Sequence, residues 1–170
     1  MKTNIYFFVF VISLLCFDYK TFAQNKIGIS TGIGLPELLN IGISYQFDEI
    51  QIGLTAGTIP KDNVTSVFIY TQFHFEKLTD SSEISPWYLM YGLNYLRDET
   101  KSKINKYFHD NFRIGREIYL TKNIVLDFNI GMVIKIAEKT FWKENNNYPL
   151  GGTDFPTFFP SLGINTFYKF

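Results

Sequence analysis

The glycines of this chain keep a fixed phase relative to its large apolar residues. The segments Ile27–Gly34 and Ile41–Phe47 alternate large side chains with glycine, serine or glutamine. Successive side chains of a β-strand point to opposite faces, so each segment has one apolar face and one small, mildly polar face. This pattern predicts a transmembrane β-barrel whose small face lines a narrow lumen. Ten of the twelve glycines follow it: Gly28, Gly32, Gly34, Gly42, Gly53, Gly57, Gly92, Gly115, Gly131 and Gly163.

The N-terminus has the pattern of a secretory signal peptide. Lys2 supplies a positive charge, Ile5–Phe17 is an apolar run, and Thr21–Ala23 has the small residues of a cleavage site. The apolar run is shorter than the about 20 residues that a spanning helix needs. We therefore expect a cleaved signal peptide over residues 1–23 and secretion across the inner membrane.

The remaining domain, residues 24–170, excludes several classes of protein by its composition. It has no cysteine, because Cys16 lies in the expected signal peptide, where Leu15 replaces the small residue of a lipoprotein signal. It is therefore not a disulfide-stapled domain. The whole chain has 16 basic and 16 acidic residues, so no basic excess points to a nucleic acid. No metal-binding or phosphate-binding motif occurs, and we expect neither a metal nor a cofactor.

Turn and loop residues divide this domain into eight alternating segments. Most approach the about 9–11 residues that a tilted strand needs to cross a bilayer. The predicted strands are Lys26–Gly34, Asn40–Phe47, Ile50–Gly57, Val64–Glu76, Trp87–Leu96, Tyr107–Leu120, Ile124–Ala137 and Phe158–Phe170. The odd-numbered connections, predicted to face outside, are Leu35–Leu39, Thr58–Asn63, Arg97–Lys106 and Glu138–Thr157.

The C-terminus carries a family resemblance. Leu162–Phe170 alternates and ends on an aromatic residue, although Asn165 stands where the family's usual glycine would fall. The chain resembles the small eight-stranded outer-membrane barrels, such as outer-membrane protein X and the membrane domain of outer-membrane protein A. It is most similar to uncharacterised outer-membrane β-barrel proteins of Bacteroidetes. The resemblance, over Lys26–Phe170, implies a bacterial outer-membrane protein that contacts lipid and lipopolysaccharide, with Tyr168 and Phe170 read by the barrel-assembly machinery.

The inward phase fills the predicted lumen with polar side chains. Eight strands leave room only for side chains, and unpaired charge there is costly. We expect Arg113 and Lys135 to neutralise Glu76, Glu117 and Asp127. Such a network either holds the barrel shut or conducts protons or ions, and the narrow lumen favours a closed barrel. The other residues in this phase are Gln46, Gln51, Tyr70, Gln72, His74, Asn94, Asn129 and Asn165.

The fourth external connection, residues 138–157, concentrates large apolar residues outside the barrel. A long connection of this kind is often functional, and exposed aromatic residues anchor partners. Alternatively, these residues cover the barrel mouth. In the third connection, Lys101, Lys103 and Lys106 either pair with lipopolysaccharide phosphates or are simply solvated. The apolar residues of the fourth connection are Phe141, Trp142, Tyr148, Leu150 and Phe155.

Three polar residues of the sixth predicted strand need an explanation other than a place in the lumen network. His109, with Glu99 and Ser102 nearby in sequence, is the kind of rim residue that lipid A-modifying barrel enzymes use, but no serine adjoins it. Asp110 and Arg116 fall in the lipid-facing phase, and Arg116 either snorkels to the interface or marks a bulge near Gly115.

The sequence therefore predicts a small closed outer-membrane barrel with a structural or surface-interaction role, neither a general porin nor an enzyme. Two alternatives stay open. One is a lipid A-modifying enzyme that uses residues near His109. The other is a soluble secreted barrel around an apolar ligand, which requires six outward-phase residues to point inward: Ile27, Ile41, Ile52, Leu89, Ile130 and Ile164.

Overall fold

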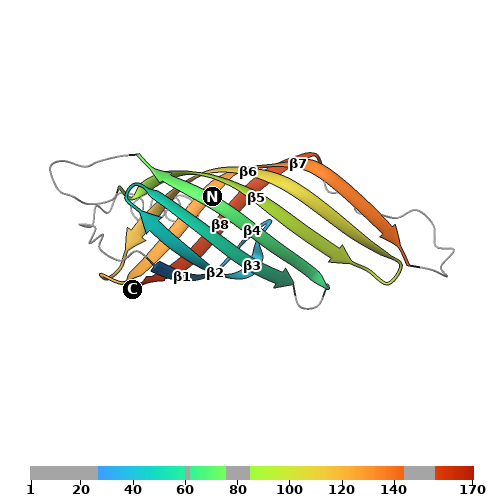
Figure 1. Ribbon diagram of the computed structural model, residues 1–170, viewed down its shortest axis with the longest axis horizontal. Helices are drawn as coiled ribbons and strands as arrows, with labels where there is room; N and C mark the ends of the chain where they lie inside the picture. The colour runs from blue at the N-terminus through green and yellow to red at the C-terminus, as the bar shows by residue number, and fades with distance from the viewer. Residues whose placement is uncertain (1–26, 60–61, 76–84, 144–155) are drawn as a thin grey trace, which may run out of the picture.

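A computed structural model describes residues 27–59, 62–75, 85–143 and 156–170. The eight strands in these ranges pair antiparallel in sequence order, and the first pairs with the last to close a barrel (Figure 1). No helix formed by the described residues has the length and hydropathy needed to cross a membrane. The strands are β1 (Ile27–Leu35), β2 (Leu38–Phe47), β3 (Ile50–Ile59), β4 (Val64–His74), β5 (Trp87–Glu99), β6 (Lys103–Tyr119), β7 (Ile124–Trp142) and β8 (Phe158–Lys169).

The predicted fold class, an eight-stranded antiparallel barrel, is confirmed. Each predicted strand has a counterpart at its expected place in the chain, and neighbouring strands are joined up and down around the barrel. The expected signal peptide, residues 1–23, lies outside the described residues.

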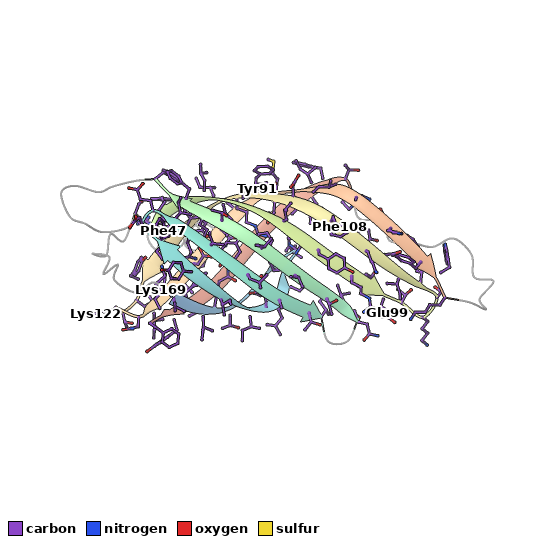
Figure 2. All side chains as sticks on the ribbon, in the orientation of Figure 1. Phe47, Tyr91, Glu99, Phe108, Lys122 and Lys169 are labelled. Atoms are coloured by element: carbon purple, nitrogen blue, oxygen red, sulfur yellow. The ribbon has the colours of Figure 1, made fainter. Side chains whose placement is uncertain are left out.

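The outer surface is apolar on all eight strands. Figure 2 shows side chains projecting from the outside of the wall, with Phe47, Tyr91 and Phe108 among them. The six residues that a soluble barrel would have to turn inward all point outward and are between 49 and 63% exposed. Their orientation is therefore opposite to what the soluble alternative requires.

The inner face is built from glycines, aromatic rings and polar side chains. The Tyr70 ring covers Gly53 and the Tyr88 ring covers Gly115, so closely that a Cβ atom at either glycine would overlap the ring. Because the lumen of eight strands holds only side chains, each large ring needs a small neighbour. This packing explains the phase of the glycines.

Strands β5, β6 and β7 are longer than predicted. The expected loop over Arg97–Lys106 contains only a turn at residues 100–102, and β7 runs to Trp142 instead of ending at Ala137. In the added parts of these strands, residues 97–99, 103–106 and 138–142, both faces carry polar residues. The alternation of apolar and polar residues that marks a strand is therefore absent there. Figure 1 shows this part of the wall reaching beyond the neighbouring ends of β3 and β4, at the end of the barrel opposite the C-terminus.

The irregularity in the pairing of β6 with β7 lies away from Arg116. The pairing with β7 shifts between Phe108 and His109, whereas the register is unbroken around Gly115. The bulge proposed near Gly115 is therefore wrong. The Arg116 guanidinium lies over the Trp87 ring, 5.2 Å from its centroid, so an aromatic partner accommodates this cation on the outward phase.

Candidate functional site

The connection between β1 and β2 folds into the barrel. Pro36 and Glu37, which form this turn, are both buried. Two glycines make room for them, because a Cβ atom at Gly57 would overlap the Glu37 carbonyl oxygen and one at Gly34 would lie 2.8 Å from Glu37 Oε2. The turn therefore fills the lumen.

Arg113 of β6 meets Glu37 inside the barrel and forms an ion pair with it. Its Nη1 donates to Asn129 Oδ1 at 2.8 Å, its Nε to Asn111 Oδ1 at 3.0 Å, and its Nη2 to the Leu35 carbonyl oxygen at 3.0 Å. A guanidinium has five donors in a fixed fork. Arg113 uses them to connect the inserted turn to two strands of the opposite wall.

Asp127 of β7 continues this network through neutral donors. The Tyr88 hydroxyl donates to its Oδ1. Asn129 Nδ2 and Asn165 Nδ2 donate to its Oδ2 at 2.8 and 2.9 Å. Asn129 thus joins Asp127 to Arg113, and one connected set of hydrogen bonds crosses the lumen from β5 to β8.

A second buried ion pair lies near the C-terminal end of the barrel. Lys169 Nζ donates to Glu117 Oε2 at 2.7 Å, and the Tyr119 hydroxyl donates to the same oxygen at 2.6 Å. The Glu117 and Lys169 side chains are almost fully buried. This pair holds β6 to β8 across the lumen, because β7 lies between them in the wall.

A small cavity lies between these groups, among the residues that the structure describes. One cavity of about 10 Å³ lies beside Arg113 and Asp127. That volume holds about one water molecule. It is therefore too small for a water column, and its remaining lining residues are Ser30, Glu37, Asn40, Thr55, Phe68, Tyr70, Gln72, Met90, Asn165 and Phe167.

The ion pairs differ from those that the sequence predicted. Arg113 pairs with Glu37, and Glu117 pairs with Lys169. Lys135 binds Glu138 at 2.6 Å toward the other end of the barrel. Glu76 lies outside the described residues. Arg113, Glu117 and Asp127 point inward, as the alternation predicts. The predicted ion-pair partners of Arg113 and Glu117 are wrong.

Two ion-pair partners, Lys169 and Glu37, are absent from the predicted network, and the sequence signal for their burial differs. Lys169 lies four residues after the inward-phase Asn165, so the same alternation places it in the lumen. Glu37 stands in a turn, where alternation carries no information, and only the packing of the turn over Gly57 brings it inside.

The His109 side chain faces the interior of the barrel and does not lie at its rim. It is buried, its Nδ1 lies 3.4 Å from Asn94 Oδ1, and the Tyr107 ring stacks near it. Glu99 lies opposite Ile104, five residues along β6 from His109, which is about 16 Å of strand. The described contacts therefore do not bring His109 and Glu99 together as a catalytic pair.

The apolar residues predicted for the fourth connection are only partly described. Phe141 and Trp142 belong to β7, where both are exposed. Lys106 and Lys139 place their Nζ atoms 4.8 and 5.0 Å from the centroid of the Phe141 ring. Tyr148, Leu150 and Phe155 lie outside the described residues.

The C-terminal aromatic residues face outward at the seam of the barrel. Tyr168 and Phe170 are about half exposed, and their rings meet edge to face with centroids 4.9 Å apart. The Phe170 backbone nitrogen donates to the Ile27 carbonyl oxygen at 2.9 Å. The last residue therefore extends the pairing of β8 with β1.

No three His, Cys, Asp or Glu residues in the described ranges gather closely enough to hold a metal ion. Comparisons of the chain with family models, with curated proteins and with solved structures find no significant match.

The ion pair between Glu37 and Arg113 predicts a large stability change. Arg113→Met should lower the free energy of unfolding by about 3–5 kcal/mol, because it leaves the Glu37 carboxylate buried without its cation. Adding Glu37→Gln should recover part of this loss. Denaturant titration of the single and double variants measures both effects.

Lys135→Met provides the matched control, since it removes a cation from a partly exposed pair and should cost at most about 1 kcal/mol. Equal losses in Arg113→Met and Lys135→Met would contradict a structural role for the inserted turn.

Proposed function

We propose that this protein is a small closed β-barrel of the bacterial outer membrane, with a structural or surface-interaction role. The observation that carries the proposal is the belt of exposed large apolar side chains on all eight strands, around a filled polar lumen. Soluble monomers rarely expose contiguous apolar patches above a few hundred Å². A lipid bilayer is the surrounding in which such a surface is favourable.

The closure of the sheet supports the same proposal. In lipid every backbone polar group needs a partner within the protein, and a barrel satisfies this because it has no open edge. The strands are 9 to 19 residues long, against the about 9–11 that a tilted strand needs to span the hydrocarbon core. Length and pairing therefore both suit a membrane.

The filled lumen argues against a general porin. The inserted turn, the network around Arg113 and the pair of Glu117 with Lys169 occupy the interior. A cavity of about 10 Å³ offers no path for a hydrated solute. The burial of His109 inside the wall gives no support to a lipid-modifying enzyme at the rim.

The proposed partners follow from this location. Outer-membrane lipid and lipopolysaccharide contact the apolar belt, and the barrel-assembly machinery reads Tyr168 and Phe170. An extracellular ligand would bind the end of the barrel where β5 turns into β6 and where β7 ends, because Phe141 and Trp142 are exposed there. The N-terminal signal peptide proposed over residues 1–23 accounts for secretion.

Membrane location and closure can be tested together. The protein should fractionate with the outer membrane and migrate faster on gels before heating than after, because the folded barrel is compact. In planar bilayers it should show no steady conductance. Recovery only in the soluble periplasm would overturn the membrane assignment, and porin-sized conductance would overturn closure.

The terminal aromatic residue should matter for assembly. Phe170→Lys keeps the backbone hydrogen bond to Ile27 but removes the ring that packs on Tyr168. The yield of heat-modifiable barrel in the outer membrane should fall several-fold. Tyr45→Lys, which changes another outward aromatic residue on a different strand, is the control. An unchanged yield for Phe170→Lys, or an equal fall for both variants, would remove the special role of the terminus.

A further inference from the structure

Three cations lie side by side on the outer face of the long wall. In the strand register Arg97 of β5 is opposite Lys106 of β6, and Lys106 is opposite Lys139 of β7. All three belong to the outward phase, because the residues on either side of Arg97 and Lys106 in sequence, such as Leu96 and Tyr107, point inward. We refer to Arg97, Lys106 and Lys139 as the cationic row.

Directly opposed like charges destabilise a pair of strands. Within the described residues, Glu99 is the carboxylate that forms an ion pair with a member of the row. It binds Arg97 at 2.6 Å and also binds Lys143 at 2.7 Å. The hydrogen bond from Lys143 holds the pKa of the Glu99 carboxyl below its usual range. This carboxylate therefore serves two other cations, and no ion pair among the described residues compensates Lys106 or Lys139.

The other nearby carboxylates have different partners or positions. Glu138 binds Lys135, and Asp110 accepts a hydrogen bond from the Tyr91 hydroxyl at 2.9 Å. Asp98 is opposite Asn105 on the inward phase. None of these described residues forms an ion pair with Lys106 or Lys139, whose Nζ atoms both lie near the Phe141 ring.

The row also has a defined depth relative to the apolar belt. The next outward residues toward the belt are Tyr95 and Phe108, which face each other with ring centroids 5.1 Å apart. They lie two residues, or about 7 Å of strand, from the row. Aromatic rings of membrane proteins lie at the level of the lipid headgroups. The row then lies at or just above that level.

We propose that the cationic row, with the Phe141 ring beside it, binds the phosphate group of an anionic membrane lipid. The inference rests on the membrane location proposed above. A phosphate supplies the missing negative charge and accepts hydrogen bonds from both lysines and from Arg97. Its acyl chains lie along the apolar wall below Tyr95 and Phe108.

Native mass spectrometry of the barrel in mixed phosphatidylcholine and phosphatidylglycerol nanodiscs tests this proposal. The wild-type protein should retain phosphatidylglycerol in preference to phosphatidylcholine. Each lysine near an anionic surface contributes about a fivefold preference. Lys106→Gln should therefore weaken retention about fivefold, and Lys106→Gln with Lys139→Gln about 25-fold.

Lys122→Gln is the matched control. Lys122 lies in the β6–β7 turn, at the end of the barrel opposite Glu99 (Figure 2). The substitution therefore removes one positive charge far from the cationic row. The control should keep the wild-type preference. An equal loss in Lys122→Gln, or an unchanged preference in the double variant, would overturn the site.

Two further results separate the possible failures. If the protein does not insert into phosphatidylcholine bilayers at all, the membrane location fails and the inference fails with it. If it inserts without any preference for phosphatidylglycerol, only the lipid site fails. Displacement of the lipid by inorganic phosphate, but not by chloride at equal ionic strength, would assign the row to a soluble phosphate and overturn the lipid source.

Discussion

The lumen of an eight-stranded sheet is too narrow for a water column, so each charged group inside it needs partners supplied by the protein. Two ion pairs, Arg113 with Glu37 and Lys169 with Glu117, supply such partners for four buried charges. The first depends on a turn that enters the barrel, and the second depends on the final strand. Closure of the sheet and neutralisation of its interior are therefore parts of one arrangement.

The outer face follows from the same constraint. Because glycines, rings and polar groups occupy most of the inner phase, most of the large aliphatic residues are left on the outside. Toward the end opposite the C-terminus the outward residues change from aromatic to cationic on β5, from Tyr95 to Arg97, and on β6, from Phe108 to Lys106. On β7, Lys139 lies at the level of the two cations. That order matches the change from hydrocarbon to headgroup across the interface of a bilayer.

The eight strands and the two faces could be predicted from the sequence because alternation is a local signal that glycine phase reinforces. Alternation also placed Arg113, Glu117 and Asp127 inside. Alternation does not predict the burial of Glu37, which depends on how a turn packs over Gly57. It also predicts an end of β7 at Ala137, because both faces of the strand become polar beyond that residue. The partners of a buried charge come from residues distant in sequence, and a single chain gives no local signal for them.

We propose that the apolar outer face contacts lipid. Single nitroxide labels at Ile41 and Ile43, in a chain without Cys16 and reconstituted in vesicles, measure this contact directly. Both labels should be accessible to dissolved oxygen and protected from a water-soluble nickel chelate, while a label at the turn residue Lys122 should show the reverse. Strong access of the nickel chelate to Ile41 and Ile43 would mean that this face is in water and would contradict its contact with lipid.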